Sequence, residues 1–197
     1  MGVPVNSLAS PRFCGVRTFQ RLPYSADCSG NDFAVLGVPF DTATSYRPGC
    51  RFGPAAIRDA SSILKSYHSV LDVDIFEHCQ GVDAGDVDII PGYLDESFER
   101  IEAAVAGVLD AAIEAGVTGI LEDGALPIVL GGDHSITLPE LRAVAKRHGP
   151  VALLHFDAHS DTGDDFFGKP YNHGTTFHWA IEEGLILPEQ STQAGIR

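Results

Sequence analysis

The sequence predicts an α/β fold in which a parallel sheet is covered by helices on both faces. Short apolar runs alternate along the chain with longer segments whose apolar residues recur at helical spacing. Two polar motifs, beginning at Gly131 and Asp157, each follow directly after such a run. Alternating strands and helices are typical of parallel sheets, which bind ligands beyond the carboxyl ends of their strands. We therefore expect both motifs to lie at one ligand site.

Strands are expected where short apolar runs are bounded by turn-forming residues. Residues 70–76 alternate apolar with acidic side chains, which indicates a strand with one exposed face. Residues 1–32 contain several prolines and show no clear period, so they are interpreted as an irregular segment before a domain of residues 33–197. The expected strands are residues 33–38, 70–76, 126–130 and 151–156, with the start of another at 194–196.

Helices are expected where apolar residues recur every three or four positions. Pro54 suits the first turn of a helix, and Gly116 suits the residue after a helix end. Thr137 and Glu140 have the spacing of a capping box, which indicates a helix start. The expected helices are residues 54–66, 98–112, 137–145 and 176–183.

Composition excludes several classes of protein. The chain has 27 acidic and 13 basic residues, a formal net charge of −14, and such a surface repels nucleic-acid phosphates. The acidic field favours a cationic substrate, although solubility alone accounts for the same charge. No stretch approaches the roughly 18 apolar residues of a membrane span, and no secretory signal is evident. The cysteines show no CxxC pair, so we expect reduced thiols in a cytoplasmic protein.

Asp157, His159 and Asp161 place metal-binding side chains at every second position after the apolar run 151–156. In an extended segment the two aspartates would stand about 13 Å apart, at about 3.3 Å per residue, so the segment must curl before both reach one ion. Carboxylate and imidazole ligands suit Mn²⁺ and, less diagnostically, Zn²⁺ or Fe²⁺. Turn formation is the alternative role for the aspartates, but their regular spacing around a histidine favours a metal site.

Other histidines have weaker signals. His134 lies in the segment 131–135, whose paired glycines by themselves equally indicate a structural turn. His173 is interpreted as either a surface loop residue or a proton shuttle, since imidazole titrates near neutral pH. His155 is interpreted as a residue that packs behind the site or supports its ligands from outside, and His178 as structural.

Two further features lie outside the predicted metal motifs. Asp83 and Asp86 have the right chemistry to extend a metal cluster, but a turn explains them equally well, and we leave them out of the site. Arg47 lies in the long loop of residues 39–53, and we expect it to shape the mouth of the pocket.

Together these segments resemble the ureohydrolase family of arginases, agmatinases and related amidinohydrolases. The resemblance runs from about Phe33 to Arg197, and the loop 37–49 together with His155 is most similar to the agmatinase branch. It implies an arginase-like three-layer α/β/α fold with a mainly parallel sheet. The matching motifs are Gly49-x-x-x-Gly53-Pro54-x-x-Ile57-Arg58, Gly131-Gly-Asp-His134-Ser, His155-Phe-Asp157-Ala-His159-Ser-Asp161 and Asn172-His173-Gly-Thr175.

The resemblance implies manganese-dependent hydrolysis of a small cationic guanidino compound, foremost agmatine, to putrescine and urea, as in polyamine biosynthesis. Family members bind two Mn²⁺ ions bridged by a hydroxide that attacks the guanidinium carbon, and we expect full-length members to be homo-oligomers. Carried over by motif, His134, Asp157 and Asp161 would hold the first ion, and Asp157 and His159 the second. Asp161 would also orient the hydroxide, and His173 would shuttle protons.

Family members also carry a later motif with two more metal-binding aspartates and a guanidinium-binding glutamate. This chain ends at Arg197 before that motif, so we expect a catalytic domain truncated at its C-terminus. By the family mapping it would stably hold at most one ion and form negligible urea. The alternatives are an inactive ureohydrolase remnant and a guanidinobutyrase-type amidinohydrolase. A zinc deacetylase on a related scaffold is disfavoured by the agmatinase-like loop.

Overall fold

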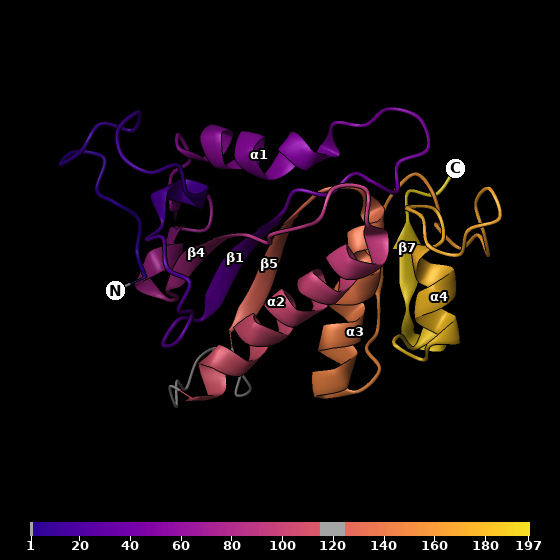
Figure 1. The fold of residues 1–197 in the computed structure, drawn as a ribbon. Coiled ribbons are helices and arrows are strands. Elements are labelled where there is room, and N and C mark those ends of the chain that lie inside the picture. Colours follow the sequence, from indigo (N-terminus) through magenta and orange to yellow (C-terminus); the bar gives the residue numbers. More distant parts are fainter. Residues whose placement is uncertain (1, 115–124) are drawn as a thin grey trace. The chain divides into compact units, whose positions relative to one another are not determined.

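The chain forms two compact units that alternate along the sequence. The computed structural model describes residues 2–114 and 125–197. The first unit comprises the described residues within Met1–Pro39, Phe52–Val87 and Gly107–Leu130, and the second comprises Phe40–Arg51, Asp88–Ala106 and Gly131–Arg197. Figure 1 follows the chain through both units by colour. The separation into residues 1–32 and 33–197 stays a prediction.

The first unit contains a three-stranded sheet. Strand β1 (Phe33–Val38) lies between β4 (Gly81–Asp86) and β5 (Leu126–Gly131), and β1 and β4 run parallel. Strands β1 and β5 confirm the predictions for 33–38 and 126–130. Apolar residues of this sheet and of neighbouring segments form the core of the unit, including Ala34, Val35, Val82, Val108 and Leu130.

Strand β4 corrects the interpretation of Asp83 and Asp86 as turn residues. Gly81 opens the strand because the ring of Phe33 occupies the space that a side chain there would need. Asp83 is fully buried, and its carboxylate receives two hydrogen bonds from Arg58, at 2.7 Å from Nε and 2.9 Å from Nη2. Arg58 also binds Asp86 at 2.5 Å. The buried Arg58 guanidinium therefore pairs with both carboxylates, and it offsets the charge of the buried Asp83, as a buried charge requires.

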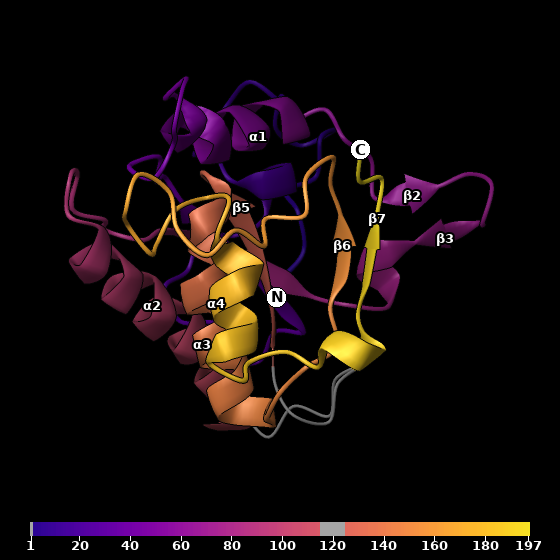
Figure 2. The ribbon, with the colours of Figure 1, turned by 90° about the vertical axis from the view of Figure 1, so that its right-hand side faces the viewer.

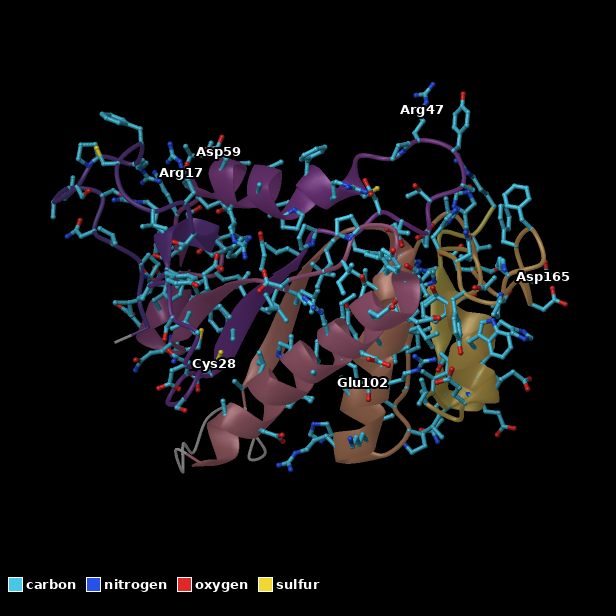
Figure 3. The ribbon with its side chains drawn as sticks, in the orientation of Figure 1. Arg17, Cys28, Arg47, Asp59, Glu102 and Asp165 are labelled. Carbon is cyan, nitrogen blue, oxygen red and sulfur yellow. The ribbon has the colours of Figure 1, made fainter. Side chains whose placement is uncertain are left out.

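Helix α1 (Gly53–Ser61) carries Arg58 and ends five residues earlier than predicted, in turns closed by backbone hydrogen bonds from Ser62 and Leu64. An exposed pair on the same unit, Arg17 and Asp59, lies 3.3 Å apart and can be followed in Figure 3. Exposed pairs of this kind contribute little stability. The buried Arg58 pairs are the ones that tie α1 to β4.

The prediction of one strand over residues 70–76 is wrong, because only Val73–Asp74 within this range forms a strand. Strands β2 (Tyr67–His68) and β3 (Val73–Asp74) form a short antiparallel hairpin, followed by a 3₁₀ turn at Ile75–Glu77. Asp72 adopts a positive φ of 53°, and the Asp74 side chain accepts the backbone N–H of Phe76. The acidic residues that suggested alternation therefore form local turns, which aspartate side chains favour.

The second unit contains a parallel pair of strands, β6 (Leu154–Phe156) and β7 (Thr192–Ala194), which lie side by side in Figure 2. Strand β6 is shorter than the predicted 151–156, because Val151 makes only an isolated bridge to Ile186. Strand β7 lies two residues before the predicted start at 194. The second unit has an aromatic cluster centred on Phe98. The ring centroid of Phe98 lies 6.2 Å from that of Phe40 and 5.8 Å from that of Tyr171.

Helices α3 (Thr137–His148) and α4 (Thr176–Glu182) also belong to the second unit and confirm the predicted helices. Arg142 on α3 forms two hydrogen bonds of 2.7 Å with Glu183, just beyond α4. Helix α2 (Leu94–Glu114) begins before the predicted Phe98, and Gly116 lies outside the described residues. Further 3₁₀ turns lie at Phe19–Arg21, Cys50–Phe52, His134–Ile136 and Pro188–Gln190.

The capping box predicted at the start of α3 is wrong. The residue before the helix is Ile136, and Thr137 makes no capping hydrogen bond. Instead, Asp133 caps the 3₁₀ turn of His134–Ile136 that leads into α3, by accepting the N–H of Ser135. The Oε1 atom of Glu140 is buried and makes no hydrogen bond to the helix start. None of the described helices is both long enough and apolar enough to cross a membrane.

Glu140 predicts a pH dependence of stability. Although part of the residue is exposed, its Oε1 is buried with no hydrogen-bond partner among the residues described, and burial raises its pKa from 4.5 to about 8. Between these values the unfolded chain binds fewer protons than the folded chain, so this group lowers stability as pH rises. Glu140→Gln should therefore gain stability relative to the wild type between pH 5 and pH 8, measured by urea denaturation.

The exposed Glu182→Gln is the matched control, since it removes one carboxylate from the surface of α4. It should leave the pH dependence of unfolding unchanged. Identical pH slopes for Glu140→Gln and the wild type would contradict the buried, protonated state of Glu140.

Candidate metal centre and active site

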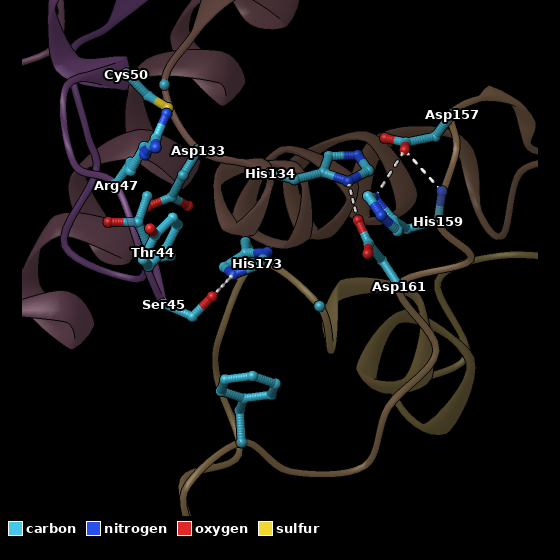
Figure 4. A pocket seen from close by; sticks show the side chains of 14 residues that line it. Thr44, Ser45, Arg47, Cys50, Asp133, His134, Asp157, His159, Asp161 and His173 are labelled. Carbon is cyan, nitrogen blue, oxygen red and sulfur yellow. Dashed lines mark hydrogen bonds and ion pairs between the residues drawn. The ribbon is translucent and has the colours of Figure 1, made fainter. Parts of the chain in front are cut away.

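A cavity of about 530 Å³ lies within the second unit, and the predicted metal-binding side chains line it (Figure 4). Its walls come from the loop after β1, the turn before α3, the loop after β6 and the loop before α4. The lining residues are Thr44, Ser45, Tyr46, Arg47, Cys50, Gly132, Asp133, His134, Asp157, His159, Asp161, Phe166, His173 and Gly174.

Asp133 joins two of these walls. It is only 5% exposed, and its Oδ2 accepts the backbone N–H of Ala43 at 3.0 Å. Its Oδ1 accepts both the N–H and the hydroxyl of Ser135, at 2.9 and 2.5 Å, and its own N–H donates to the carbonyl of Phe40 at 2.8 Å. Burial raises the pKa of Asp133, and the hydrogen bonds from Ser135 and Ala43 partly oppose that shift.

The segment after β6 curls as its chemistry requires. Asp161 has a positive φ of 49°, which turns the chain back, and its carbonyl accepts the N–H of Phe177 at the start of α4. Asp157 Oδ1 accepts the N–H of His159 at 2.9 Å. That backbone N–H is the main reason why the pKa of Asp157 is lowered, so the carboxylate is ionised and competent to bind a cation near neutral pH.

His134 and Asp161 converge from different loops. His134 Nδ1 lies 2.5 Å from Asp161 Oδ2, and the carbonyl of His134 accepts a hydrogen bond from Thr176 at 3.0 Å. Two atoms that both carry lone pairs require a proton between them at this separation, so the contact is a hydrogen bond. This pair is the closest approach of two predicted ligands among the described residues.

His155 lies directly behind this pair. It is 7% exposed, its ring stacks on His134 with centroids 5.1 Å apart, and it packs at an angle against the Phe177 ring with centroids 4.6 Å apart. Ligand atoms of His134, His155 and Asp157 all lie within 4.8 Å of one another. His159 is more exposed, with its Nδ1 3.5 Å from Asp157 Oδ1.

His173 faces the cavity from the opposite wall. Its Nε2 lies 3.0 Å from the hydroxyl of Ser45, and the neighbouring Asn172 donates to the carbonyl of Ala43 at 2.7 Å. The loop that carries Arg47 is thus attached to the loop that carries His173. His178 lies on α4, against Trp179, and lines no part of the cavity.

The donor set fits a divalent metal ion. The cavity collects two carboxylates and two imidazoles from His134, Asp157, His159 and Asp161, and His134 and Asp161 are already in hydrogen-bond contact. Mixed carboxylate and imidazole ligands suit Mn²⁺ among other first-row ions. Four residues that contact this set or its neighbours had no role predicted from the sequence, although Asp133 and Ser45 lie within the segments that carry the family resemblance: Asp133, Ser45, Thr176 and Gln193.

Comparisons with known proteins agree with this arrangement. A family model described as the arginase family matches residues 31–197. The chain is 41% identical to guanidinobutyrase from Pseudomonas aeruginosa and 43% identical to agmatinase from Neisseria meningitidis, and in each case the match covers 98% of this chain and 58% of the relative. The chain thus spans less than two thirds of the length of these relatives.

Solved structures give the same result. Proclavaminate amidinohydrolase from Streptomyces clavuligerus superposes with a TM-score of 0.86 at 41% identity, covering 95% of this chain and 58% of the other. Formiminoglutamase from Trypanosoma cruzi with Mn²⁺ superposes with a TM-score of 0.70 at 27% identity, covering 85% of this chain and 53% of the other. These similarities confirm the arginase-like α/β fold with a parallel sheet.

The hydrogen bonds of Asp133 predict that removal of its carboxylate loosens the backbone locally. Asp133→Ala deprives Ala43 and Ser135 of their acceptor, and leaving buried donors unpaired costs about 1–3 kcal/mol. We expect faster amide hydrogen exchange at both residues and lower thermal stability. Asp165→Ala, which removes an exposed carboxylate, is the matched control (Figure 3). Unchanged exchange at Ala43 in Asp133→Ala would contradict the role of Asp133 in joining the two walls.

Proposed function

The chain belongs to the arginase family, and from this premise we propose that its cavity hydrolyses the guanidinium group of a small guanidino compound with Mn²⁺ as cofactor. The observation that carries the proposal is the convergence of two carboxylates and two imidazoles on one cavity that His173 also lines. A solved relative that contains Mn²⁺ supports the choice of metal. The cysteines are free, which fits a reducing compartment such as the cytoplasm.

The family motifs give each ligand a role in the proposal. His134, Asp157 and Asp161 would hold a first ion, with Asp157 and His159 available to a second. The close pair of His134 and Asp161 and the ionised state of Asp157 support the first assignment. Three protein ligands can hold a metal whose remaining positions are filled by water, whereas two seldom suffice. Among the described residues the proposal therefore predicts one firmly bound ion.

The chemistry needs an activated water and a route for protons. Mn²⁺, if held by these ligands, would supply the activated water, because a divalent ion lowers the pKa of bound water towards neutrality. Asp161 would hold the attacking water in position with its carboxylate. His173 would deliver a proton from Nε2 to the departing amine, and its contact with Ser45 keeps that nitrogen directed into the cavity.

Two classes of substrate are candidates, and they differ in the charged group at the end opposite the guanidinium. Agmatine is the first, and agmatinases are among the similar proteins. A guanidino acid is the second, because other similar proteins are a guanidinobutyrase and a guanidino acid hydrolase. Arg47 favours the second candidate, since it lines the cavity and its guanidinium lies 5.2 Å from the ring of Tyr46. A carboxylate tail would pair with Arg47, whereas the ammonium of agmatine would be repelled by it.

Calorimetric titration with Mn²⁺ tests the ligand set. We expect a stoichiometry near one, and loss of binding in His134→Ala and Asp161→Asn, because each removes one of three ligands. His178→Ala is the control, since that histidine lines no part of the cavity. A stoichiometry near two would contradict the ligand count, and binding unaffected by either ligand variant would contradict the site.

Urea release tests the reaction. With agmatine, guanidinobutyrate and guanidinopropionate we expect a negligible rate compared with a full-length relative, because few ligands are available to a second ion. Any urea that forms should require Mn²⁺ and should be lost in His173→Ala. Arg47→Gln should weaken turnover of the two acids and spare agmatine. Urea formed without Mn²⁺ would refute the proposed reaction. Full Mn²⁺ binding with no urea from any substrate would favour the inactive remnant.

A further inference from the structure

One ring nitrogen of His155, Nε2, lacks a hydrogen-bond partner among the described residues. The residue occupies the middle of β6, and this nitrogen is buried. Asp157 Oδ2 lies 3.5 Å from this nitrogen. Geometry alone groups His155 with His134 and Asp157 as a potential ligand. Whether Nε2 can bind a metal depends on which ring nitrogen carries the proton.

The contacts of Gln193 indicate which ring nitrogen of His155 carries the proton. It lies opposite His155 in the register of β6 and β7, and its side-chain nitrogen is 2.8 Å from the carbonyl of Ser160 and 3.0 Å from His155 Nδ1. A carbonyl oxygen only accepts hydrogen bonds, so the amide nitrogen, not the amide oxygen, must face Ser160. The same NH₂ group then donates its second hydrogen to His155 Nδ1.

The tautomer of His155 follows. In a neutral imidazole one nitrogen accepts and the other carries the proton. Because Nδ1 accepts from Gln193, the proton is on Nε2, and a protonated nitrogen has no lone pair for a metal. We infer that Gln193 and His155 form a positioning pair, in which Gln193 fixes His155 as an N–H donor that holds the Asp157 carboxylate from behind.

The surroundings of His155 favour a fixed donor. Its ring is held between His134 and Phe177, so it cannot turn to exchange its two nitrogens without losing both contacts. Asp157 Oδ1 is already occupied by the N–H of His159, which leaves Oδ2 as the oxygen nearest Nε2. A shortening of about 0.5 Å would bring Nε2 and Oδ2 to ordinary hydrogen-bond distance.

The effect of this pair on metal binding rests on the proposed function, because the pair would orient the Asp157 carboxylate towards a bound ion. Hydrogen bonds to the ligands of a metal orient those ligands, and their removal lowers metal affinity by about 10- to 100-fold. Asp157 would therefore bind the ion directly, whereas His155 and Gln193 would hold Asp157 in place without binding the ion.

Nitrogen NMR of the isotope-labelled chain tests the tautomer directly, because the ¹⁵N shift of a ring nitrogen that carries a proton differs widely from that of one with a lone pair. We expect Nε2 of His155 to be protonated and Nδ1 not, both without metal and with Zn²⁺ as a diamagnetic probe. A proton on Nδ1, or loss of the Nε2 proton on addition of Zn²⁺, would overturn the inference.

Gln193→Glu provides the matching variant. A carboxylate accepts from Nδ1, so it should move the proton to Nδ1 and leave Nε2 free to bind Zn²⁺. Gln190→Glu, which makes the same change on the exposed turn before β7, should leave the tautomer as in the wild type. An unchanged tautomer in Gln193→Glu would contradict the control that Gln193 exerts.

Metal affinity separates this inference from the proposed function. His155→Leu should lower Mn²⁺ affinity by about 10- to 100-fold without changing the stoichiometry. Equal affinity in His155→Leu and the wild type would overturn the supporting role of the pair. A wild-type chain with the expected tautomer that binds neither metal would refute the proposed function and, with it, the role of the pair towards an ion, while the control of the tautomer by Gln193 would stand.

Discussion

The cavity depends on one buried carboxylate, that of Asp133. Its two oxygens bind backbone and hydroxyl donors from Ala43 and Ser135, while its own N–H binds Phe40. The loop after β1 and the turn before α3 are therefore held together at the residue that precedes His134. Burial of Asp133 is tolerated because each oxygen has donors, and an unpaired carboxylate there would be costly. The position of His134 in the cavity follows from this attachment.

The second constraint is the short length of β6. The strand ends at Phe156, so Asp157 lies at its carboxyl end, and the positive φ of Asp161 turns the following loop back towards His134. This is the place where parallel strands bind ligands. Strand β7 contributes Gln193 to the same place from a position 38 residues further along the chain than His155. Asp157 and the two residues that support it thus come from neighbouring strands of one small sheet, whereas His134 reaches the same cavity from the turn before α3.

Much of this could be predicted from the sequence, and the exceptions have physical causes. Strands β1 and β5 and helices α3 and α4 have strong apolar periods, and the aspartate–histidine spacing predicted the curled loop. Strand β4 was missed because Gly81, Asp83 and Asp86 are typical of turns, and only the buried Arg58 makes a strand with two aspartates stable there. The capping box was wrong because Asp133 caps the preceding turn instead. The contact between Ser45 and His173 joins residues 128 positions apart, and no local pattern indicates it.

The central claim is that His134, Asp157, His159 and Asp161 form one metal-binding surface. Paramagnetic broadening of backbone amide signals by substoichiometric Mn²⁺ tests it most directly, because the effect falls steeply with distance from the ion. We predict the strongest broadening at His134 and at residues 157–161, with the signals of Asp83 and Asp86 retained, since both carboxylates are already paired with Arg58. Strongest broadening at Asp83 and Asp86, or at the acidic hairpin of Asp72 and Asp74, would contradict the account.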